Sequence, residues 1–198
     1  MDIIFATNNR HKLEEVRHLT GQRFTLLSLE DTGLQGDIPE DYNTLEENAL
    51  FKARYIFSKT GIPVFADDTG LEIAALNNRP GVFSARYAGN NKNDQANMDK
   101  VLEEMKNVTD RSARFRTVIA FVWDNEKEKL FEGIVNGKIG YEKKGGQGFG
   151  YDPLFIPDGF DITFAEMPLD IKNSISHRSR AYRKFAAFLN ERFLKSVV

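Results

Sequence analysis

The chain has no cysteine and only three histidines in 198 residues. Without thiols it cannot form a disulfide, an iron–sulfur cluster or a thiolate zinc site. Three scattered histidines do not suggest a zinc site either. If the protein binds a metal, carboxylate ligands would hold it, and these favour Mg²⁺, with Mn²⁺ as the alternative.

Long apolar runs and a basic excess are also missing. No apolar segment approaches the ~18 residues that a membrane-spanning helix needs. The first residues predict a strand and a polar loop rather than a signal peptide. A formal net charge of −2 argues against a general binder of nucleic acids or membrane surfaces. We therefore expect no nucleic acid polymer and no membrane as partner, and a cytoplasmic location.

What is present predicts a mixed α/β fold. A chain that is 41% hydrophobic and 28% charged is typical of an ordinary globular protein. Its length suits a single domain, 1–198, or two lobes that share one core. Apolar runs predict strands at residues 3–6, 24–29, 62–66, 114–123 and 130–139. Helices are expected near 13–19, over 45–61, from about 94, and from 174–180 onwards. The hairpin formed by the last two strands adds antiparallel pairing, so the sheet should be mixed.

The adjacent acids Asp67 and Asp68 follow the apolar run 62–66. Two neighbouring carboxylates repel each other, so a buried strand that ends in them needs a hard cation, a basic cluster or a reacting water beside it. Ligands of open α/β sheets also bind where strands end. We expect the strand to end at this pair, in a metal-dependent catalytic centre. Successive residues of an extended segment point to opposite sides, so we expect the two carboxylates not to share one metal equally, and the one that does not bind it to hold a basic neighbour or a backbone donor.

A polar loop between the first strand and the first helix predicts an anion site. Its residues are Thr7, Asn8, Asn9, Arg10, His11 and Lys12. The free N–H groups and dipole of a helix start favour a phosphate, and Arg10 and Lys12 add positive charge. The glycine spacing of a P-loop is absent. A capped helix with a solvated basic first turn explains the same pattern, although cations at a helix start oppose the dipole and so favour an anionic ligand.

A glycine-rich loop at 145–153 predicts a second binding element. Four glycines among residues 145–150 let the backbone approach a ligand closely. Phe149, between two of them, would serve as a stacking platform for a base, or would tuck into the core. Lys172, His177 and Arg178 place donors near the start of the last helix, where a solvated basic turn is the alternative.

Six short motifs, in order along nearly the whole chain, carry a resemblance. They are Thr-x-Asn-x-x-Lys at 7–12, Glu-Asn-Ala at 47–49 followed by Lys52, Ala-Asp-Asp-Thr-Gly-Leu at 66–71, Ser-Ala-Arg-Tyr at 84–87, Gly-Phe-Gly-Tyr-Asp-Pro at 148–153 and Ser-His-Arg at 176–178. Each motif is weak alone, but together they are specific. The chain resembles the inosine/xanthosine triphosphate pyrophosphatase family. It departs from the family pattern at Asn8, where glycine is common, and at Thr69, where serine is usual.

The resemblance implies a fold and an activity. The fold would be a long twisted mixed sheet flanked by helices, forming two lobes with a central active-site cleft. The protein would be a Mg²⁺-dependent homodimer, with Mn²⁺ as the alternative metal. It would hydrolyse ITP, dITP and XTP to the monophosphate and pyrophosphate.

The resemblance also implies roles for individual residues. Asp68 would bind the metal with Glu40 and accept the proton of the attacking water, and Lys52 would support the phosphate or metal site. The expected substrate contacts are Thr7, Asn8, Asn9, Arg10, His11 and Lys12 for the triphosphate, Thr69, Phe149, Gly150, Tyr151, Asp152 and Lys172 for the nucleotide, and His177 and Arg178 for the base.

Two alternatives remain at this point. A related septum-type nucleotide pyrophosphatase with a pyrimidine preference has a similar fold, but the Ser-His-Arg and Gly-Phe-Gly-Tyr-Asp motifs argue against it. The second alternative is a nucleotide sensor without catalysis. The intact Asp67, Asp68, Glu40 and Lys52 argue against it, because a sensor would not need a general base.

Overall fold

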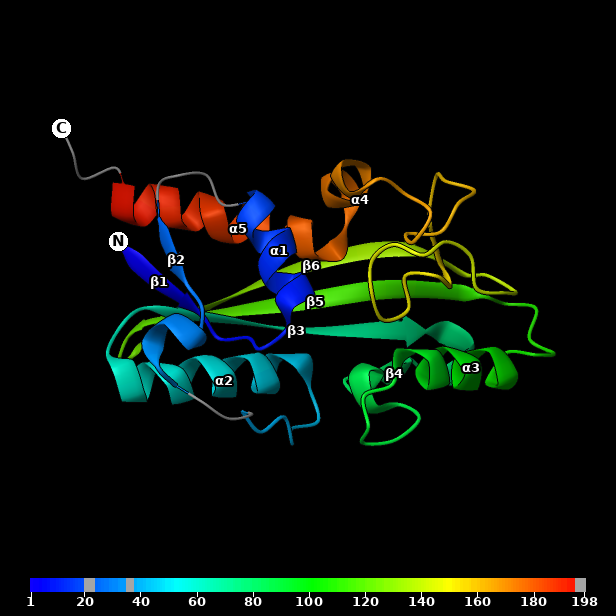
Figure 1. Cartoon of the computed structure of the whole chain (residues 1–198), viewed down its shortest axis with the longest axis horizontal. Coiled ribbons are helices and arrows are strands. Elements are labelled where there is room, and N and C mark those ends of the chain that lie inside the picture. Colours follow the sequence, from blue (N-terminus) through cyan, green and yellow to red (C-terminus); the bar gives the residue numbers. More distant parts are fainter. Residues whose placement is uncertain (20–23, 35–37, 195–198) are drawn as a thin grey trace. The chain divides into compact units, whose positions relative to one another are not determined.

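The structure is a computed structural model that describes residues 1–19, 24–34 and 38–194 (Figure 1). Its strands are β1 (Asp2–Phe5), β2 (Thr25–Leu27), β3 (Val64–Ile73), β4 (Arg79–Gly81), β5 (Ser112–Asp124), β6 (Lys127–Ile139) and β7 (Phe155–Pro157). Its α-helices are α1 (Arg10–Leu19), α2 (Leu45–Thr60), α3 (Asp94–Glu104), α4 (Leu169–Ile175) and α5 (His177–Leu189). The expected helices and strands are thus confirmed, and α4 is a separate short helix before α5.

The strands form one mixed sheet in the order β2-β1-β3-β5-β6-β7, with β4 pairing to β3. β1 runs parallel to β2 and to β3, with Ile4 opposite Val64 in the second pair. β4 is antiparallel to β3, and β7 is antiparallel to β6. The prediction of a mixed sheet is therefore confirmed.

β3 does not end at the acidic pair, so this part of the prediction was wrong. Asp67 and Asp68 lie in the middle of the strand, which continues to Ile73 and pairs there with β4. Gly70 permits this pairing, because a Cβ at that position would come 2.6 Å from the carbonyl O of Gly81. The strand tolerates two acids because basic side chains contact them, as described below.

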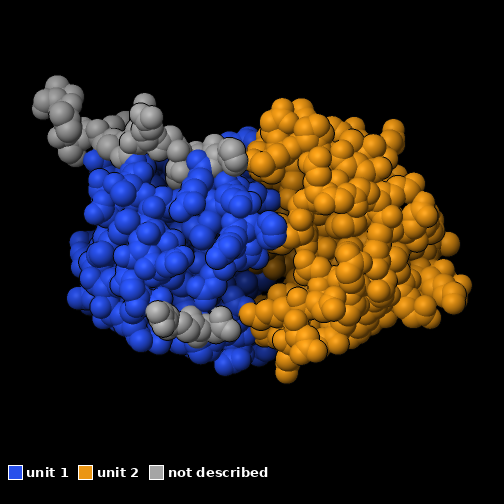
Figure 2. All heavy atoms as spheres, viewed as in Figure 1, with its two compact units in different colours: residues 1–68, 117–133, 178–198 blue, residues 69–116, 134–177 orange. Residues whose placement is uncertain are grey.

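The chain divides into two compact units, coloured separately in Figure 2. Unit 1 consists of Met1–Asp68, Thr117–Gly133 and Arg178–Val198, and unit 2 consists of Thr69–Arg116 and Ile134–His177. The division falls within β3, β5 and β6, so each of these strands contributes residues to both units.

In unit 1, helices cover both faces of the sheet. α1 and α5 lie on one side of β1 and α2 lies on the other (Figure 1). Phe5 and Phe65 stack at 4.4 Å between ring centroids, and Phe185 of α5 packs on Phe65 at 4.9 Å. α2 begins as predicted, because the Thr44 side chain accepts a hydrogen bond from Glu47 N.

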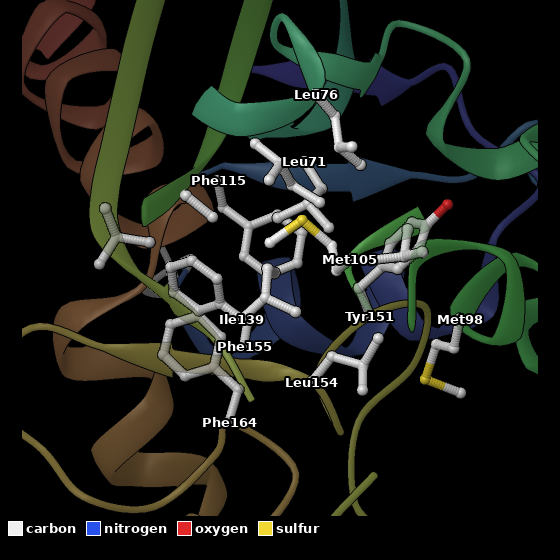
Figure 3. Close-up of a cluster of buried hydrophobic side chains, with 14 of the residues drawn as sticks. Leu71, Leu76, Met98, Met105, Phe115, Ile139, Tyr151, Leu154, Phe155 and Phe164 are labelled. Atoms are coloured by element: carbon white, nitrogen blue, oxygen red, sulfur yellow. The ribbon is translucent and has the colours of Figure 1, made fainter. Parts of the chain in front are cut away.

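Unit 2 has its own apolar core (Figure 3). Met98 and Met105 of the α3 segment pack there with Phe115 of β5 and Phe155 of β7, and the ring of Tyr151 belongs to the same cluster. The core therefore anchors both α3 and the end of the glycine-rich loop. Among the described residues, no helix combines the length and the hydropathy that a membrane crossing requires.

Candidate active site

The loop before α1 is organised by Asn9. Its Oδ1 accepts hydrogen bonds from the backbone N–H of His11 at 3.0 Å and of Lys12 at 3.2 Å, and Asn9 N–H donates to Thr7 Oγ1. The helix is thus capped, and these two N–H groups are already bonded. Phosphate binding here stays a prediction that depends on other donors: Asn8 in the loop, and Arg10 and His11 in the first turn of α1, whose side chains are all exposed.

Asp67 accepts hydrogen bonds from two basic side chains of unit 1. Lys12 Nζ lies 2.9 Å from Asp67 Oδ1, and Arg178 Nε lies 3.2 Å from Asp67 Oδ2. Arg178 also donates through Nη1 to Glu15 Oε2, so acids and bases alternate along a buried chain. This confirms that Asp67 holds basic neighbours.

The neighbouring opposite charges in this network keep Asp67 and Arg178 ionised despite their burial. Burial alone would raise the pKa of Asp67, but Lys12, Arg178 and Lys52 outweigh it and hold that pKa well below the usual range. Burial would likewise lower the pKa of Arg178, and Glu15 and Asp67 instead raise it. Asp67 and Arg178 therefore stay ionised at ordinary pH, so they are suited to fix the geometry of the site and not to transfer protons.

Asp68 faces a different set of partners on α2. Lys52 Nζ lies 2.7 Å from Glu40 Oε1, 2.8 Å from the carbonyl O of Asp67 and 3.5 Å from Asp68 Oδ1. Asn48, one helical turn before Lys52, donates from Nδ2 to Asp68 Oδ2 at 3.2 Å. The predicted residues Glu40, Lys52 and Asp68 are therefore brought together.

The two adjacent acids differ in proton affinity. Burial raises the pKa of Asp68, with contributions from Glu40 and Asp67, and Lys52 and Lys12 offset this only in part. For Lys52, burial acts to lower the pKa, but Asp68, Glu40 and Asp67 raise it to about 12. Neighbouring groups whose pKa values are pushed apart are typical of acid–base sites. Asp68 is thus the member of the pair suited to accept a proton.

The donor set fits a divalent cation bound together with a substrate. Within residues 1–19, 24–34 and 38–194, no group of three or more histidine, aspartate or glutamate side chains is placed to hold a metal ion. Glu40 and Asp68 provide two carboxylates next to one ammonium group. Mg²⁺ commonly takes one or two protein carboxylates and completes its shell with water and substrate phosphates. Glu40 and Asp68 supply two such carboxylates, and metal binding by them stays a prediction.

In unit 2, Lys172, Asp152 and Phe149 form a second cluster. Lys172 Nζ donates to Asp152 Oδ2 at 2.8 Å, and the same oxygen accepts Phe149 N–H at 2.9 Å. The ammonium group lies 5.4 Å from the centroid of the Phe149 ring. Gly148 is required here, because a Cβ at that position would come 2.1 Å from Asp152 Oδ2.

The remaining predicted residues of this loop divide between surface and core. Phe149 and Gly150 are half-buried. Both alternatives for the Phe149 ring, stacking on a base and packing into the core, stay predictions. The Tyr151 ring lies in the core, and its hydroxyl donates to the carbonyl O of Ser84 at 2.8 Å. Gly150 N–H donates to Asp94 Oδ2 at 2.8 Å. Tyr151 therefore anchors the end of the loop in the core of unit 2. A contact of its side chain with a nucleotide stays a prediction.

His177 and Arg178, which were predicted to contact the base, are both buried. The His177 ring stacks on Phe115 in unit 2, with 4.6 Å between ring centroids, whereas Arg178 belongs to the acid–base network of unit 1. Thr69, the first residue of unit 2, is half-buried on β3. Contacts of these three residues with a substrate stay predictions.

Comparison with known proteins identifies the family. The sequence model of the Ham1 family matches residues 3–188. The chain belongs to the Ham1 family. It is 50% identical over 188 residues to the dITP/XTP pyrophosphatase of Flavobacterium psychrophilum, covering 95% of this chain and 98% of that protein. It is also 50% identical to the dITP/XTP pyrophosphatase of Porphyromonas gingivalis, covering 94% of this chain and 96% of that one.

Solved Ham1 structures have the same fold. The Ham1 protein of Staphylococcus aureus superposes with a TM-score of 0.88 at 38% identity, covering 96% of this chain and 99% of that chain. The HAM1 protein of Coxiella burnetii gives a TM-score of 0.89 at 39% identity with the same coverage. The mixed α/β fold, with its sheet flanked by helices, is thus the Ham1 fold.

Sequence reasoning missed three functional candidates in this Ham1 chain. Glu15 is buried and contacts Arg178, and a signal for it existed, because Glu15 lies three positions after Lys12 on the same helix face. Asn48 lies inside a matched motif without having been assigned a role, and it contacts Asp68. Asp94 was read only as a helix start, and no local pattern reveals its contact with Gly150.

Proposed function

We propose that this Ham1 protein hydrolyses the deaminated purine nucleoside triphosphates ITP, dITP and XTP to the monophosphate and pyrophosphate. The observation that carries the proposal is the buried Asp68, with a raised pKa, beside Lys52 and Glu40. Two relatives that are 50% identical to this chain are named as pyrophosphatases of dITP and XTP, which supports two of these three substrates. The activity would keep deaminated bases out of DNA and RNA.

The geometry suits water attack on the α-phosphorus. Asp68 orients the water and takes its proton as the new P–O bond forms, and the bond from the α-phosphorus to the leaving pyrophosphate breaks. Lys52 stabilises the negative charge of the phosphates, with its ammonium group held in place by Glu40 and the carbonyl O of Asp67. A divalent cation held by Glu40 and Asp68, Mg²⁺ or Mn²⁺, would neutralise the triphosphate and lower the pKa of the attacking water.

Recognition of the base is assigned to the unit 2 cluster. The Phe149 ring offers a stacking surface, and Lys172 Nζ is a donor 5.4 Å from its centroid. Inosine and xanthosine carry an acceptor at position 6, where adenine carries an amino donor. A buried donor left unpaired against adenine can discriminate by up to ~10⁴–10⁵. Guanine shares the 6-oxo group, so rejection of GTP must use its 2-amino group.

The test is pyrophosphate release from ITP, dITP, XTP, ATP, GTP and dTTP, each with Mg²⁺, with Mn²⁺ and with EDTA. We expect release from the first three nucleotides, abolished by EDTA and restored by either metal. Release chiefly from dTTP would instead identify a pyrimidine-preferring pyrophosphatase. Binding without release from any nucleotide would identify a sensor.

The assembly and location are part of the same proposal. We expect a homodimer in the cytoplasm, where the nucleotide pool is found. Light scattering coupled to size exclusion should give twice the 22.6 kDa chain mass. A monomer at assay concentration that retains full activity would contradict the dimer.

A further inference from the structure

The glycine-rich loop and the segment before it are both held by α3. Asp94, the first residue of α3, accepts a hydrogen bond from Gly150 N–H at 2.8 Å. Lys143, just before the loop, donates to Gln95 Oε1 at 3.0 Å and pairs with Asp99 Oδ1 at 2.5 Å. Three side chains of the first two turns of α3 therefore contact this part of the chain.

α3 is a firm support for these contacts. Its cap is Asn93, whose side chain accepts from Ala96 N–H. Met98 and Val101 are fully buried in the core of unit 2. Because Asn93 already caps the helix, the carboxylate of Asp94 is available to the loop.

Asp94 completes the fixation of Phe149. Phe149 N–H is held by Asp152, and the following N–H, that of Gly150, is held by Asp94. Gly150 has a φ of +61°, a backbone conformation that glycine adopts more readily than other residues. Anchoring both peptide groups restricts the backbone on each side of Phe149 and so the direction of its ring. A loop that is ordered in advance loses less conformational entropy when a ligand binds.

We propose that Asp94 is a positioning residue for nucleotide binding, which acts by holding Gly150 and thereby orienting the Phe149 ring. This inference rests on the proposed function, because it takes Phe149 to contact the base. Asp94 does not touch the reacting phosphorus in this account. Its loss should therefore weaken substrate binding and leave the chemical step nearly unchanged.

The test compares Asp94→Ala, Asp94→Asn and the control Glu103→Ala. Glu103 is an exposed acid near the other end of α3, so its removal changes the charge equally. We expect Asp94→Ala to raise KM for ITP about tenfold, because one charge-assisted hydrogen bond is lost. Its kcat should stay within about twofold of the wild-type value. Asp94→Asn keeps a weaker acceptor and should raise KM about threefold. Glu103→Ala should match the wild type.

A second readout needs no substrate. Hydrogen exchange of the Gly150 amide, followed by NMR in the full chain, should be fastest in Asp94→Ala, intermediate in Asp94→Asn and unchanged in Glu103→Ala. Wild-type exchange and KM in Asp94→Ala would overturn the proposal, as would an equal rise of KM in Glu103→Ala. If Asp94→Ala does not fold, wild-type values in Asp94→Asn overturn it. A wild-type protein that does not cleave ITP refutes the proposed function instead, and the exchange rates still report on Asp94.

Discussion

Asp67 and Asp68 are adjacent on β3, yet their carboxylates serve different partners. Asp67 accepts from Lys12 and Arg178, whereas Asp68 accepts from Asn48 on α2. The first acid is held in its charged form, and the pKa of the second is raised by burial. One strand thus carries a structural acid and a candidate general base side by side.

Replacing Asp68 by asparagine should remove turnover and leave substrate binding. The amide is isosteric but accepts no proton at this position, so kcat should fall by about 10²–10⁴-fold. Pyrophosphate release would measure kcat, and ITP titration would measure affinity, with the exposed Asp124→Asn as control. Retained turnover would move the base role to another residue.

Replacing Asp67 by asparagine should reduce stability. Removing one member of a buried ion pair typically costs about 3–5 kcal/mol in the free energy of unfolding, because Lys12 and Arg178 lose a charged partner. Arg54→Gln breaks a pair with Glu128 in which the Arg54 side chain is 59% exposed, so its cost should stay below about 1 kcal/mol. Urea denaturation at pH 7 measures both. Equal midpoints for the two variants would contradict the buried network.

Alanine substitutions at Gly148 and Gly146 test whether activity depends on the contact between Gly148 and Asp152 or on the glycine content of the loop in general. A Cβ at Gly148 would meet Asp152 Oδ2 at 2.1 Å, and the residue has a φ of +79°. Gly148→Ala should therefore displace Asp152 and Lys172 and lower kcat/KM for ITP by about tenfold or more. At Gly146 nothing lies within 4 Å and φ is not in the left-handed region. Steady-state assays of Gly146→Ala should match the wild type, and a similar loss in both variants would count against this reading.

A pH dependence of stability is expected at Tyr87. Burial, together with the hydrogen bond from its hydroxyl to Glu104, raises the Tyr87 pKa from 10.0 to about 12. Arg79 lies 3.6 Å from the same carboxylate, and Lys100 lies over the ring. Because the folded protein holds this proton more tightly than the unfolded chain, the stabilisation is complete below pH ~10 and is lost as pH rises towards the folded pKa.

The stability difference between wild type and Tyr87→Phe should therefore narrow as pH rises from 9 to 12. Denaturant unfolding at several pH values measures this difference. The titration of the other tyrosines and of the lysines affects both proteins alike and therefore largely cancels. Tyr141→Phe, at a side chain that is 79% exposed, serves as the control for removing a tyrosine hydroxyl. If the stability difference between wild type and Tyr87→Phe stays constant up to pH 12, the Tyr87 hydroxyl gains no proton affinity on folding.

Local sequence patterns were sufficient to predict most of the helices and strands. The apolar runs of β5 and β6 and the cap at Thr44 depend on residues close in sequence, so they were predicted correctly. The order of the motifs led to the family, which the comparison confirms. The alternation of side chains along a strand predicted correctly that Asp67 and Asp68 do not share the same partners.

Tertiary packing decided which charges meet. Glu15 and Arg178 are 163 positions apart, and Asp94 and Gly150 are 56 apart, so no local period relates them. The continuation of β3 through two acids depends on Lys12, Arg178 and Lys52, which offset the repulsion, and on β4, which pairs with the end of the strand. Spacing and propensity describe one segment at a time, whereas the partner of a buried charge is set by the whole fold.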